Sequence, residues 1–168
     1  MISSGAAPDH LASDAAFLLV RELMKKSADR VFSGRCACGS VAFEARGRPK
    51  WVGICHCATC RRATGGISIA AAGFAKESVR MEGPTLAEFA SSPGVVRSFC
   101  AACGTSLNYR SARWPDDVHL MVGALDRPEA LQPQFHIFFD ERVPWACPSD
   151  DLPKYRSTPS EGVVASLT

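Results

Sequence analysis

No apolar run in the sequence comes near the roughly 18 residues that a membrane-spanning helix requires. Neither sign of charge is in excess, because 19 basic residues stand against 17 acidic ones and the formal net charge at pH 7 is +2. Proteins that bind nucleic acid or anionic membranes usually carry a basic surplus. We therefore expect no nucleic acid and no membrane among the partners of this chain, and nothing in the sequence indicates an oligomeric state.

Lys and Arg are absent from the first 20 positions. Residues 15–20 are apolar and have the length of a signal-peptide core, but a secretory signal needs a basic segment before that core, and here Asp9 and Asp14 precede it. We therefore expect a cytoplasmic protein. Asp14 can cap a short helix instead, so residues 1–30 are predicted to form an extension that includes a short helix, and Met24 is an alternative start of the chain.

Apolar and polar residues alternate with a period of two through most of the chain, as in β-strands that bury one face. The alternation is clearest in four segments: residues 41–45, 79–82, 107–110 and 135–140. Residues 118–125 are almost continuously apolar and predict a central strand, and the small apolar residues 68–74 predict a closely packed one. Turns rich in Gly and Pro separate these segments. The chain is therefore predicted to form one mainly β, antiparallel domain.

Cysteine, by contrast, is abundant, and seven of the eight cysteines lie between Cys36 and Cys103. They form the patterns C-x-C, C-x-C-x-x-C and C-x-x-C. Two cysteines at alternate positions of a strand point the same way and cannot easily bond to each other, and a secreted disulfide framework would require a signal peptide. The pattern therefore predicts metal binding rather than disulfides.

Two of the cysteine pairs resemble the two halves of a zinc knuckle. Glycine directly follows Cys38 and Cys103, and it allows the left-handed backbone turn that brings N–H groups toward a metal-bound sulfur. We expect Cys36, Cys38, Cys100 and Cys103 to form one four-thiolate structural site.

The remaining cluster is Cys55, Cys57 and Cys60. In an extended chain Cys55 and Cys57 face one side and His56 the other, so His56 is a poor ligand. Three protein ligands with a free fourth position are typical of catalytic zinc, and the alternative is that Cys147 or His136 closes the site.

Arg61 and Arg62 follow the cluster directly. They can offset its negative charge or hold a substrate carboxylate, unless they belong to a solvated loop. His136 alternates with Phe135 and Ile137, and we expect it either to line the cleft or to be a hydrogen-bonded structural histidine.

Five motifs occur in a fixed order: SGRCACGSVAFEA, CHCATCRRATGG, RSFCAACGTSL, HIFFDERVPW and DDLPKY. Together they resemble the glutathione-dependent formaldehyde-activating enzyme (GFA) family, which also includes centromere protein V. The resemblance covers roughly residues 32–156 and implies an Mss4-like β-tent of several coiled antiparallel sheets, so we expect a GFA-type zinc-binding domain over residues 31–157. It also implies two zinc ions per chain, a structural one in the four-cysteine set and a catalytic one held by Cys55, Cys57 and Cys60. Independently of the resemblance, the terminal segment TPSEGVVASLT, residues 158–168, is predicted to be a flexible tail.

The founding activity of that family is the addition of glutathione to formaldehyde, the reverse of a carbon–sulfur lyase reaction. The resemblance therefore implies a zinc-dependent lyase that acts on a thiol adduct of a small aldehyde, with glutathione as the thiol. Arg61, Arg62 and His136 are the candidate substrate-binding residues. The C-terminal motifs look closer to the uncharacterised members than to the founding enzymes, so the substrate does not transfer with the fold. The alternative hypothesis is a non-catalytic module that binds zinc or thiols for interaction or sensing.

Overall fold

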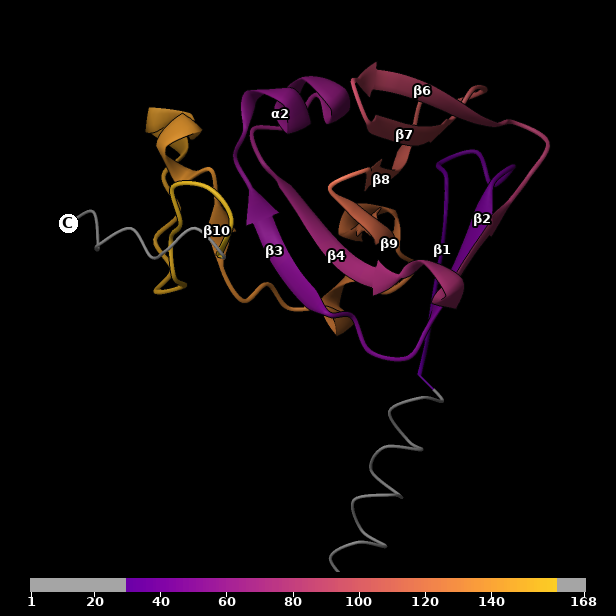
Figure 1. The fold of residues 1–168 in the computed structure, drawn as a ribbon, viewed down its shortest axis with the longest axis horizontal. Helices are drawn as coiled ribbons and strands as arrows, with labels where there is room; N and C mark the ends of the chain where they lie inside the picture. The colour runs from indigo at the N-terminus through magenta and orange to yellow at the C-terminus, as the bar shows by residue number, and fades with distance from the viewer. Residues whose placement is uncertain (1–29, 160–168) are drawn as a thin grey trace, which may run out of the picture.

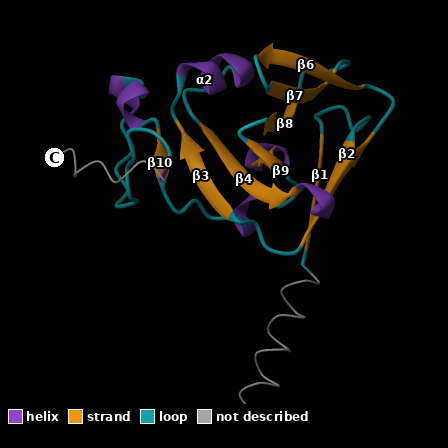
Figure 2. Ribbon diagram, viewed as in Figure 1, coloured by secondary structure: helices purple, strands orange, loops and turns teal. Residues whose placement is uncertain are grey.

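The computed structural model describes residues 30–159, and Figure 1 shows them as two β-sheets with short helical segments between strands. The helix predicted within residues 1–30 and residues 160–168 of the predicted tail lie outside the described part. Within that part, no helix is long and apolar enough to cross a membrane. The predicted fold class, a mainly β domain of antiparallel sheets, is confirmed (Figure 2).

The smaller sheet has three antiparallel strands in the order β1-β2-β5. They are β1 (Val31–Arg35), β2 (Ala42–Arg46) and β5 (Val79–Glu82). The alternation predicted for this segment is present, because Val41, Phe43 and Ala45 are buried and their neighbours in β2 are exposed.

The larger sheet has seven strands in the order β10-β3-β4-β9-β8-β7-β6, antiparallel except for the β10–β3 pair. Its strands are β3 (Trp51–Cys55), β4 (Ile69–Ala75), β6 (Leu86–Ser92), β7 (Val95–Cys100), β8 (Ser106–Ser111), β9 (Trp114–Met121) and β10 (His136–Ile137). In Figure 1 the sheet curves from β3 and β4 through β9 and β8 to β7 and β6. The predicted central strand is β9, which pairs with β4 on one side and β8 on the other.

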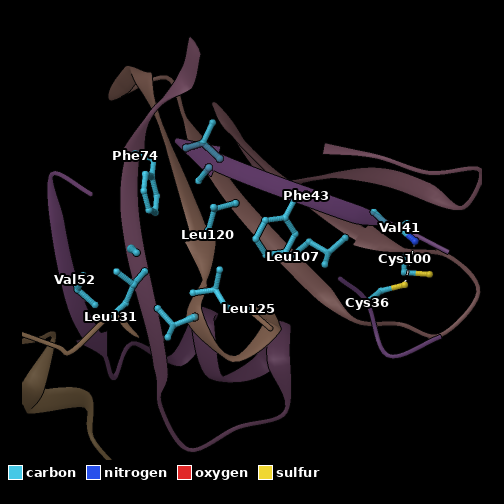
Figure 3. Close-up of a cluster of buried hydrophobic side chains, with 14 residues drawn as sticks. Cys36, Val41, Phe43, Val52, Phe74, Cys100, Leu107, Leu120, Leu125 and Leu131 are labelled. Atoms are coloured by element: carbon cyan, nitrogen blue, oxygen red, sulfur yellow. Dashed lines mark hydrogen bonds between the residues drawn. The ribbon is translucent and has the colours of Figure 1, made fainter. Parts of the chain in front are cut away.

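One face of the large sheet carries the core. Phe74, Leu107 and Leu120 are fully buried there, against Val41 and Phe43 from the small-sheet segment (Figure 3). Burying one side chain of this size stabilises the fold by about 1.5–3 kcal/mol. Because side chains alternate along a strand, the residues between these core positions face the other side of the sheet, where they are free to build a site.

Two of the predicted strands are shorter in the structure. In the segment 135–140 only His136–Ile137 is a strand, because Phe138 adopts a left-handed backbone with φ 53° and turns the chain into a 3₁₀ helix. The strand predicted at 118–125 ends at Met121. The 3₁₀ helices are η1 (Lys76–Ser78), η2 (Val122–Ala124), η3 (Pro128–Ala130), η4 (Phe139–Glu141) and η5 (Pro144–Ala146).

Candidate metal centres and the adjoining cavity

The four-cysteine set forms one cluster at the edge of the core. Its four Sγ atoms lie within 4.8 Å of one another, and Cys38 Sγ is 3.5 Å from Cys36 Sγ and 3.7 Å from Cys100 Sγ. A tetrahedral zinc site with bonds of about 2.3 Å places its sulfurs about 3.8 Å apart. Figure 3 shows Cys36 and Cys100 side by side at one end of the core. The geometry therefore fits a four-coordinate thiolate site, with ligands from both sheets.

Hydroxyl groups around this cluster favour the ionised form of the sulfurs they contact, although at Cys38 the neighbouring thiols of Cys36 and Cys103 outweigh Ser40 and raise the pKa. Three hydroxyl groups lie within 3.1 Å of a sulfur, in the pairs Ser40–Cys38, Thr85–Cys100 and Thr105–Cys103. The hydroxyl of Thr85 lowers the pKa of Cys100 to about 5, and that of Thr105 lowers the pKa of Cys103 to about 7. The glycines predicted to turn the knuckles do so, because Gly39 and Gly104 have φ of 78° and 76°.

The three-cysteine cluster sits where β3 meets a short helix. Cys55 is the last residue of β3, and Cys57 caps helix α2 (Ala58–Thr64) through its Sγ, which accepts a hydrogen bond from the backbone N–H of Cys60 at 3.3 Å. Sequence reasoning did not predict α2. Its signal was present, since Gly65 ends the helix in the left-handed conformation that glycine adopts at this position.

The thiols of this second cluster cannot all ionise without a cation. Hydrogen bonds from Cys55 and Cys60 lower the pKa of Cys57, and the contact with Cys57 raises the pKa of Cys55. One sulfur therefore carries the charge while its neighbours keep their protons. A bound cation would remove this conflict, so the donor set fits a soft divalent metal such as zinc.

No fourth protein ligand completes this cluster within residues 30–159, where no other His, Cys, Asp or Glu joins it. Both residues considered for that role lie elsewhere. The thiol of Cys147 is exposed and lies 3.9 Å from the Pro148 carbonyl oxygen. His136 Nδ1 lies 2.8 Å from His56 Nε2, and His136 Nε2 lies 3.0 Å from Asp150.

These two histidines form a buried pair on the far side of β3 from the thiols. As predicted, His56 faces away from Cys55 and Cys57, and burial lowers the pKa of His56 to about 4. Of the two alternatives stated for His136, its position agrees with a hydrogen-bonded structural histidine rather than with a residue of the cavity wall. Its side chain is fully buried, and its neighbours Phe135 and Ile137 face the cleft instead, as the alternation along a strand requires.

The cleft is a cavity of about 660 Å³ on the face of the large sheet opposite the core. On β3, β4, β7 and β8 every residue in its wall is odd-numbered, whereas the core residues of β3, β4 and β7 are even-numbered. Leu107 of β8 is an odd-numbered core residue, at the point where β8 shifts register against β7. Cys55, Cys57 and Cys60 lie in the wall. The three-thiol cluster therefore opens onto a space large enough for a substrate.

Neither Arg61 nor Arg62 belongs to that wall. Arg61 Nε donates a hydrogen bond to the backbone carbonyl of His56 at 3.2 Å, and Arg62 is exposed on helix α2. The substrate-binding role expected for the two arginines remains a prediction.

Arg97 of β7 is the basic residue that the structure brings to the cluster. Its Nη2 lies 3.8 Å from Cys60 Sγ, its guanidinium carbon lies 5.1 Å from the centre of the Tyr109 ring, and the residue is only 7% exposed. Within the described structure, Nε and Nη1 of Arg97 have no hydrogen-bond partner. Leaving charged donors buried and unpaired is costly, so this arrangement indicates a binding site for an anionic oxygen.

The family model for the glutathione-dependent formaldehyde-activating enzyme matches residues 31–141. The chain belongs to this family. A relative from Halomonas elongata, whose name describes it as a candidate glutathione-dependent formaldehyde-activating enzyme, is 28% identical to this chain over 131 residues. The match covers 68% of this chain and 79% of the relative. A crystal structure of a Rhodobacter sphaeroides protein aligns with this chain at 23% sequence identity and a TM-score of 0.48. The alignment covers 56% of this chain and 87% of the Rhodobacter chain.

Proposed function

We propose that this GFA-family protein is a zinc-dependent carbon–sulfur lyase that makes and breaks the glutathione adduct of a small aldehyde. One observation carries the proposal: three thiols without a fourth protein ligand in the described chain lie in the wall of a cavity of about 660 Å³. A closed structural site would need neither the free position nor the cavity.

The cysteines divide between two roles. Cys36, Cys38, Cys100 and Cys103 would hold the structural zinc, and Cys55, Cys57 and Cys60 would hold the second. Zinc at the second site would supply a Lewis acid that favours the thiolate form of the substrate sulfur.

The cleavage needs no oxidant or reductant. The carbon–sulfur bond of the hydroxyalkyl adduct breaks and its electron pair stays on sulfur. The hydroxyl oxygen forms the carbonyl, and its proton passes through water to the departing thiolate. Negative charge builds on that oxygen as the proton leaves, and the free Nε–H and Nη1–H groups of Arg97 would stabilise it.

The test is exchange NMR on purified, zinc-loaded protein with glutathione and a set of aldehydes. The proposal expects faster interconversion of free aldehyde and adduct, and expects Cys57→Ser to abolish the acceleration. If no aldehyde exchanges faster with the protein than without it, the lyase proposal fails. Glutathione binding without any acceleration would favour the non-catalytic thiol-binding module.

A further inference from the structure

Aromatic side chains dominate the part of the cavity beyond the thiols. Three of them, Trp51, Tyr109 and Trp114, come from strands β3, β8 and β9, and Phe135 directly precedes β10. His119 lies among them, with its ring centre 4.7 Å from that of Trp51, 5.2 Å from Tyr109 and 5.5 Å from Trp114. Burial lowers the pKa of His119 to about 4, so its ring is neutral at pH 7. This end of the cavity is therefore mainly aromatic, and two guanidinium groups lie against its rings: Arg97 and Arg113 are each 5.1 Å from a ring centre, those of Tyr109 and Trp114 respectively.

The backbone is shaped to admit these rings. A Cβ at Gly73 would lie 2.4 Å from the indole nitrogen of Trp51, and a Cβ at Gly53 would lie 2.4 Å from the ring of Phe135. Side chains at both positions would displace the rings. The two glycines, on the neighbouring strands β3 and β4, therefore leave the space that the two rings occupy.

The charged groups of the wall are placed differently. Arg97 is buried beside the thiols, whereas Arg113 and Glu141 are exposed, and Asp117 forms an ion pair with Lys50. Against the ring faces the carboxylates of glutathione would lose water. They are better placed at the exposed Arg113, which lies over Trp114 and offers both charge and access to water. The aromatic end is then available to the group that the aldehyde contributes to the adduct.

Formaldehyde contributes only one carbon and one oxygen to its glutathione adduct, so it would leave the aromatic end of the cavity without a ligand. We propose that the aldehyde carries an aromatic or similarly bulky apolar group, which packs against Trp51, Trp114 and Tyr109 while the carbon bonded to sulfur lies beside Arg97. This inference rests on the proposed function and narrows its substrate class.

Calorimetry with two stable adduct analogues tests it on the full-length, zinc-loaded protein. S-benzylglutathione carries the apolar group and S-methylglutathione lacks it. Burying a phenyl group against aromatic walls should make the benzyl analogue bind at least about tenfold tighter. Trp114→Ala should remove most of this advantage, because it should weaken binding of the benzyl analogue far more than binding of the methyl analogue.

Trp145→Ala is the matched control, because Trp145 is 79% exposed and lies outside the cavity wall. It should change neither affinity. Equal binding of the two analogues by the wild-type protein would overturn the inference and leave the lyase proposal standing, and this comparison does not depend on any variant folding. If neither analogue binds, there is no site for a thiol adduct, and both proposals fall.

Discussion

Arg97 has the central role in the proposed chemistry, and its position could not be read from the sequence. The cysteines were recognisable because their spacing along the chain is short and typical of metal ligands. Arg97 meets Cys60 only through the pairing of strands β7, β8, β9, β4 and β3, and it is 37 positions away in sequence. Arg61 and Arg62 were the expected candidates because they are adjacent to Cys60. Helix α2 directs Arg61 to the His56 carbonyl and leaves Arg62 exposed.

Arg97→Gln should therefore lower kcat/KM for adduct cleavage roughly a hundredfold, the usual effect of removing a donor to a developing oxyanion. Arg62→Gln is the control of matched chemistry and should have little effect. Steady-state kinetics on both variants, with folding checked by circular dichroism, make the comparison. If Arg62→Gln costs as much as Arg97→Gln, the role expected from the sequence is the correct one.

His119 should remain neutral well below pH 6, because burial lowers its pKa from 6.5 to about 4. Between pH 4 and pH 6.5 the imidazole of His119 is protonated in the unfolded chain but neutral in the folded one. The neutral, buried His119 therefore stabilises the fold fully only above pH 6.5. That contribution declines as pH falls toward 4, by up to about 3 kcal/mol. Urea unfolding of wild type and His119→Asn across this range should show the steeper loss in wild type. If the unfolding free energies of the two proteins change with pH in the same way, the lowered pKa of His119 is contradicted.

At the scale of elements, the pattern of the sequence predicted the sheet far better than the irregular segments. Strands such as β2, β5 and β9 pack one face or both against the protein, so their apolar residues follow a pattern that can be recognised in the sequence. Helix α2 has no buried residues, and its position depends on the thiol cap and on contacts with the rest of the fold. The turn at Phe138 requires a left-handed backbone that an aromatic residue seldom adopts, so no sequence rule would place it there.

Gly73→Ala tests whether the position of the Trp51 ring depends on the missing side chain at Gly73 of β4. The added methyl group meets the indole ring at 2.4 Å, so we expect the ring to move into the cavity and the protein to lose about 1–3 kcal/mol of stability. Gly123→Ala, where no atom lies within 4 Å of the added carbon, is the control. Chemical denaturation and tryptophan fluorescence report the two effects. Equal stability of both variants would show that the ring tolerates a side chain at position 73.

For the whole molecule, the two cysteine clusters have different positions in the architecture. Cys36 follows β1 of the small sheet and Cys100 ends β7 of the large sheet, so the four-cysteine cluster ties the two sheets together at the core. The three-cysteine cluster joins only β3 to α2 and faces the cavity on the other side of the large sheet. These positions support the proposed division into a structural site and a substrate site.

This difference predicts an unequal response to loss of a ligand. Cys103→Ser should leave the protein insoluble or without a cooperative unfolding transition, because metal binding there contributes to folding free energy. Cys57→Ser should fold and retain about one zinc per chain. Metal analysis and thermal unfolding of the two purified variants decide the matter. A Cys57→Ser protein that fails to fold would mean that the second site is structural as well.

The central claim is that the Cys55–Cys57–Cys60 site keeps a position free for a substrate thiol. Optical spectroscopy of the cobalt-substituted protein tests it directly, because a new cobalt–sulfur bond adds to the sulfur-to-cobalt charge-transfer absorption. Glutathione should increase this absorption in the wild-type protein and leave that of Cys57→Ser unchanged. A wild-type spectrum that saturating glutathione does not alter would show that the fourth position is closed to thiols, and would contradict the account.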